Sequence, residues 1–369
     1  MQVPTFPTYL KGKTASLSWI NGSDCQEGIQ AYLRSARGDP SAALVGTGWL
    51  NALNGNLISD WNNCTRGSHS MDNVVQLIHQ YGGLAYLTIT MDTQGADAWS
   101  FQQGAAYVDE ATKNPEYINS IVHEVQRAHY DGVIMDLEGV DHTYPSIQQI
   151  FATFNQKIWA ALRPLHKWYG IALIHKVSEH DEYYTLNGFE NWNLLAHCAD
   201  FIVIMSLDQS YDTPGPSVSF EWLKQLLSYT LKTMPSMLTH IIWELPLYGN
   251  SWHQEQKKWV FDGILTYQAA RAMIQQVAPS RIDVYASNLN DFYAPHLVYS
   301  DSSGVKHAVW YLTPSSLYSI IVLFNETMQE EPGFTSYLQL AFWLRTTQEP
   351  SGFWQLLDTL YWHAPSAIR

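Results

Sequence analysis

The sequence predicts an α/β protein built as a closed (β/α)8 barrel, the TIM-barrel type, with a small α+β subdomain inserted between strands seven and eight. Three observations support this fold class. Eight short runs of β-branched and aliphatic residues follow one another along the 369-residue chain, and segments with helical spacing of apolar residues separate them. The last two runs begin at residues 240 and 338, much further apart than any other neighbours.

The predicted strands are apolar runs bounded by polar or turn residues. They are residues 15–19, 43–50, 84–90, 132–137, 169–174, 201–207, 240–247 and 338–345. Between them, residues 71–81, 115–129 and 146–162 carry apolar side chains every three or four positions, as amphipathic helices do. Strands that alternate with helices indicate a parallel sheet, and eight such units fit a closed barrel better than an open sheet.

The long interval before the last strand is predicted to hold the inserted subdomain, residues 252–312. Aromatic and polar turn residues dominate it up to residue 303, residues 307–311 form a predicted strand, and a predicted helix follows at 314–326. No Gly/Ser-rich or Pro-rich linker divides the chain. Residues 1–369 are therefore predicted to be one domain that carries this insertion.

The charge balance excludes some classes of partner. Lys and Arg number 20 against 34 Asp and Glu, which gives a formal net charge of −14. Phosphate backbones are bound mainly through clustered basic residues, so we expect no nucleic-acid partner. No apolar run approaches the roughly 18 residues of a transmembrane helix, and the first residues lack the basic and then apolar pattern of a secretory signal. We expect a monomer with no membrane partner.

Cysteines and histidines give no sign of a metal site. Cys25, Cys64 and Cys198 form no Cys-x-x-Cys pair; Cys198 is expected to be buried, and whether Cys25 and Cys64 are bridged is left open. Residues 174–182 contain two histidines and three acids without the spacing of a zinc motif, so a solvated loop is favoured. We expect neither a metal nor an organic cofactor.

Two acids follow the fourth predicted strand, at the end where barrels of this type carry their functional residues. Strand side chains alternate, so Ile134, Asp136 and Glu138 are expected to project to one face. Two carboxylates this close repel each other, and one of them should keep its proton. A carboxylic acid that is protonated near neutral pH can act as a general acid. The alternative is that both acids merely end the strand in solvent.

Four segments in order along the chain resemble one enzyme family. Residues 131–138, DGVIMDLE, look like the DGxDxDxE signature of glycoside hydrolase family 18, the chitinase family. Residues 205–208, MSLD, are similar to its M-x-Y-D, residues 245–249, LPLYG, resemble its PLYG segment, and Trp343 falls where the family keeps a tryptophan under the scissile sugar. Residues 306–310 and the helix at 314–326 look most like the spore-germination, cortex-lytic branch.

The resemblance implies a retaining, substrate-assisted mechanism, in which the sugar's own 2-acetamido oxygen attacks the anomeric carbon. Glu138 would protonate the leaving oxygen and then activate water. Asp136 would accept the acetamido N–H and stabilise the cyclic cation. Asp208 falls where the family contacts the sugar at the cleavage point.

The chain departs from the family pattern at two positions. Ile134 stands where the family usually has a second Asp that shares a proton with the next one, so Asp136 is expected to lack that partner and to turn toward Glu138. Leu207 stands where a Tyr normally donates a hydrogen bond to the acetamido group. The candidates to replace that donor are Tyr211, Gln209 and Tyr248.

Aromatic residues are the other sign of a sugar-binding protein. The chain has 15 Trp and 22 Tyr, and several of them follow predicted strands. Flat rings offer an apolar face on which the C–H surface of a sugar packs. Trp343 is the first candidate for such a platform, with Trp49 and Trp252 after it; core filling is the alternative for each.

The prediction is a hydrolase of β-1,4-linked N-acetylglucosamine glycans, with peptidoglycan slightly ahead of chitin, located outside the cell or at the cell wall or spore. The first alternative is a catalytically inactive chitinase-like barrel that binds such glycans as a lectin, suggested by Leu207 and Ile134. The second is a glycosidase with a carboxylate nucleophile, Asp208 or Glu244, which would also accept sugars without an N-acetyl group.

Overall fold

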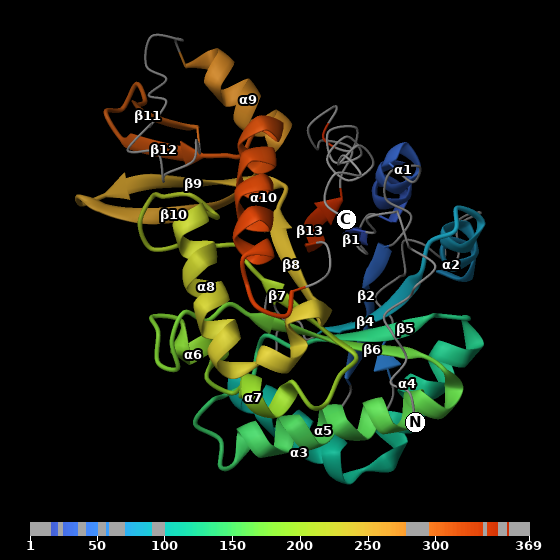
Figure 1. Ribbon diagram of the computed structural model, residues 1–369. Coiled ribbons are helices and arrows are strands. Elements are labelled where there is room, and N and C mark those ends of the chain that lie inside the picture. Colours follow the sequence, from blue (N-terminus) through green and yellow to red (C-terminus); the bar gives the residue numbers. More distant parts are fainter. Residues whose placement is uncertain are drawn as a thin grey trace.

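The computed structural model describes residues 16–20, 25–35, 42–50, 57–58, 71–90, 100–277, 295–334, 338–345 and 353. A parallel sheet with helices packed around it forms the main body of the molecule (Figure 1). Its eight parallel strands are β1 (Ser16–Ile20), β2 (Ala42–Leu50), β4 (Ala85–Thr90), β5 (Gly132–Asp136), β6 (Trp168–Ile174), β7 (Phe201–Met205), β8 (Ile241–Pro246) and β13 (Gln339–Arg345). Each lies within a few residues of a predicted strand.

The strand pairings run around a ring. The order is β1-β13-β8-β7-β6-β5-β4-β2, and β1 also pairs with β2, while the two-residue strand β3 (Leu57–Ile58) adds to β2 in antiparallel fashion. First and last parallel strands are therefore neighbours, as Ser16 opposite Leu340 shows. This curled parallel sheet agrees with the predicted fold class.

Most of the helices lie between the parallel strands in sequence and cover the outside of the parallel sheet, whereas helix Tyr267–Gln276 lies with the second sheet described below (Figure 1). The helices are α1 (Cys25–Ser35), α2 (Met71–Gln80), α3 (Phe101–Lys113), α4 (Pro115–Arg127), α5 (Ile147–Leu162), α6 (Tyr184–Asn187), α7 (Trp192–Leu195), α8 (Phe220–Thr233), α9 (Tyr267–Gln276) and α10 (Pro314–Gln329), with 3-10 turns at Arg163–Leu165 and Pro235–His240. Asn114 ends α3 and caps α4, where its side chain accepts the N–H of Glu116 and Pro115 takes the first helical position. None of the helices in the described ranges is long and apolar enough to cross a bilayer.

Strand alternation separates an inward face of the sheet from a face that packs on the helices. On β8, the Trp243 ring meets Phe324 of α10 in an edge-to-face contact with ring centroids 4.9 Å apart. Trp243 therefore points to the helix layer, and its neighbour Glu244 points to the opposite, inner side. The same alternation on β5 places Ile134 and Asp136 together on one face.

A second sheet lies between β8 and β13 in the sequence and to one side of the parallel sheet (Figure 1). Its antiparallel strands are β9 (Tyr248–Glu255), β10 (Lys258–Thr266), β11 (His296–Ser300) and β12 (Lys306–Trp310), in the order β10-β9-β12-β11. Of these four strands, only β12 was predicted, at 307–311. The sheet also begins before residue 252, because β9 starts at Tyr248 and only Leu247 separates it from β8.

Candidate active site

Asp136 and Glu138 lie where the sequence placed them, at the carboxyl end of β5. Asp136 is the last residue of the strand and its side chain is buried, whereas the Glu138 side chain is open to solvent. Enough protein atoms still flank the Glu138 carboxyl group that burial raises its pKa to about 7, and the Asp208 carboxylate adds to this shift. Glu138 therefore keeps a proton in weakly acidic solution.

Two further acids come to the same place from other strands. Asp208 follows β7, and Glu244 lies on β8 with 2% of its surface exposed. Burial raises the pKa of Asp136, Asp208 and Glu244, and the charges of Asp136, Glu138 and Asp208 raise that of Glu244 further. The fold thus gathers four carboxyl groups that the sequence spreads over more than a hundred residues.

Asp208 is held by a partner from the second sheet. The Tyr248 hydroxyl at the start of β9 donates to Asp208 Oδ1 at 2.8 Å. This bond and the nearby Asn250 amide favour the ionised form of Asp208 and partly offset the effect of burial on its pKa. The sequence suggested Tyr248 as a sugar contact; in the structure its hydroxyl proton points to an acid.

The loop after β7 carries three of the predicted binding residues and turns sharply. β7 ends at Met205, two residues earlier than predicted, because the Ser206 N–H donates to carbonyl oxygens of Ile204 and Glu244. Asp208 then adopts a left-handed backbone, with φ of 59°. Tyr183 donates its hydroxyl to the carbonyl oxygens of Asp208 at 3.2 Å and Gln209 at 3.1 Å. Sequence reasoning missed Tyr183, because nothing in its own segment points to this loop.

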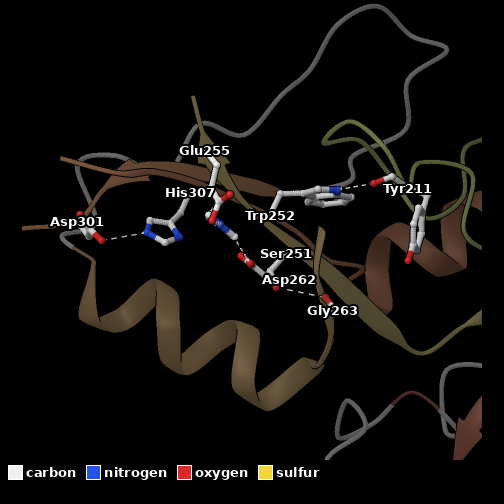
Figure 2. Close-up of polar contacts among 9 residues, drawn as sticks. Tyr211, Ser251, Trp252, Glu255, Asp262, Gly263, Asp301 and His307 are labelled. Atoms are coloured by element: carbon white, nitrogen blue, oxygen red, sulfur yellow. Dashed lines mark hydrogen bonds and ion pairs between the residues drawn. The ribbon is translucent and has the colours of Figure 1, made fainter. Parts of the chain in front are cut away.

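Two of the predicted sugar contacts, Tyr211 and Trp252, prove to be linked to each other. Figure 2 shows the indole N–H of Trp252 on β9 donating to the Tyr211 carbonyl oxygen, at 2.7 Å. The Trp252 side chain is fully buried, so its ring offers no face to a sugar and instead supports the loop. Tyr211 is 51% exposed, with its ring against Phe261 of β10 at 4.5 Å. Tyr211 therefore retains a surface on which a ligand can pack.

The other predicted platforms lie on the parallel sheet. Trp343 on β13 is half-buried, and its ring centroid is 6.0 Å from that of the buried Trp19 on β1. Its carbonyl oxygen accepts the N–H of Leu247, which fixes the end of β13 against the link between β8 and β9. Trp49 lies on β2, but its side chain falls outside the described part of the chain, as does Cys64.

A buried lysine and a buried glutamate near these acids were not predicted. Lys176, expected in a solvated loop after β6, is fully buried and donates to the Glu190 carbonyl oxygen at 2.7 Å. Burial raises the pKa of Glu190 to about 8, although the Lys176 charge opposes the shift, and lowers that of Lys176. His175 is also buried, between the rings of Tyr183 and Trp222. His175 and Lys176, from the segment 174–182 that was predicted to be a solvated loop, are therefore part of the buried interior.

Other side chains around the sheet have structural environments. Cys198 is a free, buried thiol whose sulfur donates to the Leu194 carbonyl oxygen at 3.3 Å. Within the ranges that the structure covers, no three or more His, Cys, Asp or Glu side chains are arranged to hold a metal ion.

Solved structures of chitinases and of a spore cortex-lytic enzyme share the fold of this curled parallel sheet. A chitinase from Chromobacterium violaceum superposes with a TM-score of 0.74 over 94% of this chain and 98% of its own, at 19% identity. The spore cortex-lytic enzyme SleL of Bacillus cereus gives 0.72 over 94% of this chain and 74% of its own, at 17% identity.

In sequence, the chain is 25% identical over 232 residues to YdhD of Bacillus subtilis strain 168, a proposed sporulation-specific glycosylase. The match covers 61% of this chain and 50% of YdhD, so the chain spans about half the length of this curated relative. No family model matches the sequence. The predicted resemblance to the chitinase-like proteins of glycoside hydrolase family 18 is confirmed by these relatives, at the level of the fold.

Proposed function

We propose that the protein is a glycoside hydrolase that cleaves glycans containing β-1,4-linked N-acetylglucosamine. The observation that carries the proposal is Glu138, whose pKa of about 7 keeps it protonated at the end of β5, beside the buried Asp136. A general acid with a pKa near the working pH is what cleavage of a glycosidic bond requires. The chitinases and the cortex-lytic enzyme with the same fold support this choice of substrate class.

In the proposed mechanism, Glu138 donates its proton to the glycosidic oxygen while the substrate's acetamido oxygen attacks the anomeric carbon. The C–O bond to the leaving sugar breaks and a cyclic oxazolinium forms. Asp136, as a carboxylate, accepts the acetamido N–H and stabilises the positive charge. Glu138, now ionised, takes a proton from a water molecule, whose oxygen attacks the anomeric carbon. This attack opens the oxazolinium ring, regenerates the acetamido group and leaves the anomeric configuration retained.

Another donor must hold the acetamido oxygen in place of the family tyrosine, since Leu207 has none. Tyr248 already donates to Asp208, and Tyr211 is turned toward Phe261. Gln209, next to Asp208, has a buried side-chain oxygen without a hydrogen-bond partner among the described residues, and the NH2 group of the same amide is a donor. We assign the role to the Gln209 amide, with Tyr211 and Trp343 as the sugar-packing rings.

The relatives favour the same substrate and the same location as the sequence does. Sporulation and spore-cortex names among the relatives favour peptidoglycan over chitin and an association with the spore or cell wall. Residues 1–369 are proposed to form one barrel in which the segment 252–312 is an insertion next to the acids, because Tyr248 and Trp252 tie it to the loop after β7.

The experiment compares the protein with its Glu138→Gln variant on a chromogenic N,N′-diacetylchitobioside and on peptidoglycan glycan strands. Loss of the proton donor should lower kcat by about 10²- to 10⁴-fold. Glu330→Gln, an exposed glutamate at the end of α10, is the matched control and should leave the rate unchanged. Equal, background-level release by the protein and by Glu138→Gln would contradict the hydrolase.

Two other outcomes distinguish the alternatives. Binding of chitotetraose without hydrolysis would indicate the lectin-like protein that Leu207 and Ile134 favour. Hydrolysis of a plain β-glucoside at a comparable rate would indicate a carboxylate nucleophile and would contradict the role given to the acetamido group.

A further inference from the structure

Glu244 is a buried acid that the reaction described above does not use. It lies in the middle of β8, opposite Met205 of β7 and Ala341 of β13, which are both apolar. Because Trp243 before it packs on α10, the Glu244 side chain points to the inner side of the sheet. A buried carboxyl group in apolar surroundings lowers the stability of the fold. Its presence here therefore suggests a functional role.

The backbone of Glu244 is fixed by the same turn that carries Asp208. The Ser206 hydroxyl donates to the Glu244 carbonyl oxygen at 2.6 Å, and the Ser206 N–H donates to it at 3.0 Å. Two bonds to one carbonyl oxygen leave β8 little freedom to shift relative to β7 at this point. Glu244 is therefore held at a defined height among the acids.

Asp136 and Glu244 each have a buried carboxyl oxygen without a hydrogen bond in the described part of the chain. These oxygens are Asp136 Oδ1 and Glu244 Oε1. The titratable groups that act on Glu244 are the carboxyls of Asp136, Glu138 and Asp208, and Glu244 in turn acts on Tyr248; none of them is a cation. Buried acids without a cation cannot all be ionised, so a proton must remain within the group.

We propose that Glu244 is a positioning residue that holds this proton, as a neutral carboxylic acid, and so lets Asp136 act as the carboxylate. The residue would do from β8 what the family's second Asp does from β5, where this chain has the buried, apolar Ile134. Glu244 is suited to hold the proton because it is buried between apolar neighbours and faces the carboxyl groups of Asp136, Glu138 and Asp208. The inference rests on the proposed function and deepens it.

Two variants of Glu244 test the proposal. Glu244→Gln keeps the size, the neutral state and a hydrogen-bond donor; Glu244→Leu keeps the volume and removes the polar group. We expect Glu244→Gln to retain kcat/KM on the chitobioside at pH 6 to within about threefold, and Glu244→Leu to lower kcat by about tenfold or more. Wild-type rates in Glu244→Leu, or a loss in Glu244→Gln equal to that of Glu138→Gln, would overturn the proposal.

The pH profile provides the readout that a purely structural role would not move. If Glu244 is neutral in the active enzyme, Glu244→Gln removes no charge, and the alkaline limb set by Glu138 should stay within about 0.3 pH units of its wild-type position. If Glu244 were ionised, the variant would remove a negative charge near Glu138. The pKa of Glu138 would then fall, and a shift of that limb by about one unit to lower pH would overturn the proposal.

Thermal unfolding separates a failure of this inference from a failure of the proposed function. Because the pKa of Glu244 is raised in the folded protein, its contribution to stability is fully present below about pH 4.5 and is lost as pH rises toward the folded pKa. The Tm of Glu244→Gln should therefore exceed that of wild type by a margin that grows above pH 4.5, while Glu330→Gln stays parallel to wild type. A constant margin would overturn the inference even in a protein that hydrolyses nothing.

Discussion

The acids at the end of the parallel sheet and those of the second sheet have opposite surroundings. Asp301, beside β12, accepts the N–H groups of Ser303 and Val305, both at 2.9 Å, and contacts His307 at 3.3 Å, and these partners lower its pKa. Figure 2 shows the Asp301–His307 pair at one edge of the sheet. Asp136 is buried with an oxygen that has no hydrogen-bond partner in the described part of the chain, and its pKa is raised.

A histidine of the second sheet has charged partners too. His253 on β9 lies between Asp262 and Glu255, which raise its pKa. These opposite charges stabilise the fold modestly because they are exposed to solvent. The comparison teaches that the raised pKa values at the parallel sheet are not a general property of this acidic protein. They follow burial: Asp136, Glu138, Asp208 and Glu244 share them at one place, as expected of a site that sacrifices stability for function, and Glu190 and Asp200 have them as well.

Among the variants that test this contrast, the largest effect is expected from Asp136→Asn. Removing the carboxylate should lower kcat on the chitobioside by about 10²- to 10³-fold, because the cation formed in the reaction loses its counter-charge. The same variant should unfold at a higher temperature than wild type, by a margin that grows as pH rises above about 4, since the raised pKa of Asp136 makes its ionisation unfavourable in the folded protein. A lower Tm at pH 7 would contradict the contrast between the two regions.

An intermediate effect is expected from Tyr248→Phe, which removes the hydroxyl that donates to Asp208. The pKa of Asp208 should rise, and its lost charge should no longer raise the pKa of Glu138. The alkaline limb of kcat/KM should therefore move to lower pH, with about tenfold less activity at pH 7.

Tyr144→Phe is the control for that variant. It breaks a similar bond, from the Tyr144 hydroxyl to Asp109 Oδ2 at 2.9 Å, away from the four acids. Its pH profile should match that of wild type. An unchanged profile in Tyr248→Phe as well would mean that Asp208 does not influence Glu138.

The smallest effect is expected from Asp301→Asn, and its sign should be opposite to that of Asp136→Asn. Because the folded pKa of Asp301 is lowered, its stabilising contribution is present above the unfolded pKa and is lost as pH falls through the folded one. The variant should have a slightly lower Tm than wild type at pH 7, the same Tm near pH 2, and unchanged hydrolysis. Differential scanning calorimetry at both pH values measures this directly.

The sequence predicted the parallel strands well and the second sheet poorly, for a physical reason. The apolar runs of β5 and β7 are buried on both faces and leave a clear signal. β9 and β10 alternate or mix polar and aromatic residues, and the hairpin between them turns at Gln256 and Lys257, with φ of 47° and 66°. Such turns usually contain Asn and Gly, so the most informative hairpin signal is absent here.

The candidate site was predictable where it depends on one strand and not where it depends on several. Alternation along 134–138 was enough to place Asp136 and Glu138 together. The hydrogen bond from Tyr248 to Asp208 joins residues 40 positions apart, which no local pattern can reveal. The turn at Asp208 was missed because the apolar Leu207 before it extended the predicted strand too far. Lys176 was missed because a buried lysine is rare and its polar neighbours indicated solvent.

The contact between Trp252 and Tyr211 has a consequence for protein engineering. One hydrogen bond across 41 residues joins the second sheet to the segment that carries Asp208, Gln209 and Tyr211. A chimera that exchanges residues 252–312 for a foreign insertion would remove the indole donor and leave the Tyr211 carbonyl oxygen to find a new partner. Such a graft will need a replacement donor at this point if the shape of the neighbouring loop is to survive.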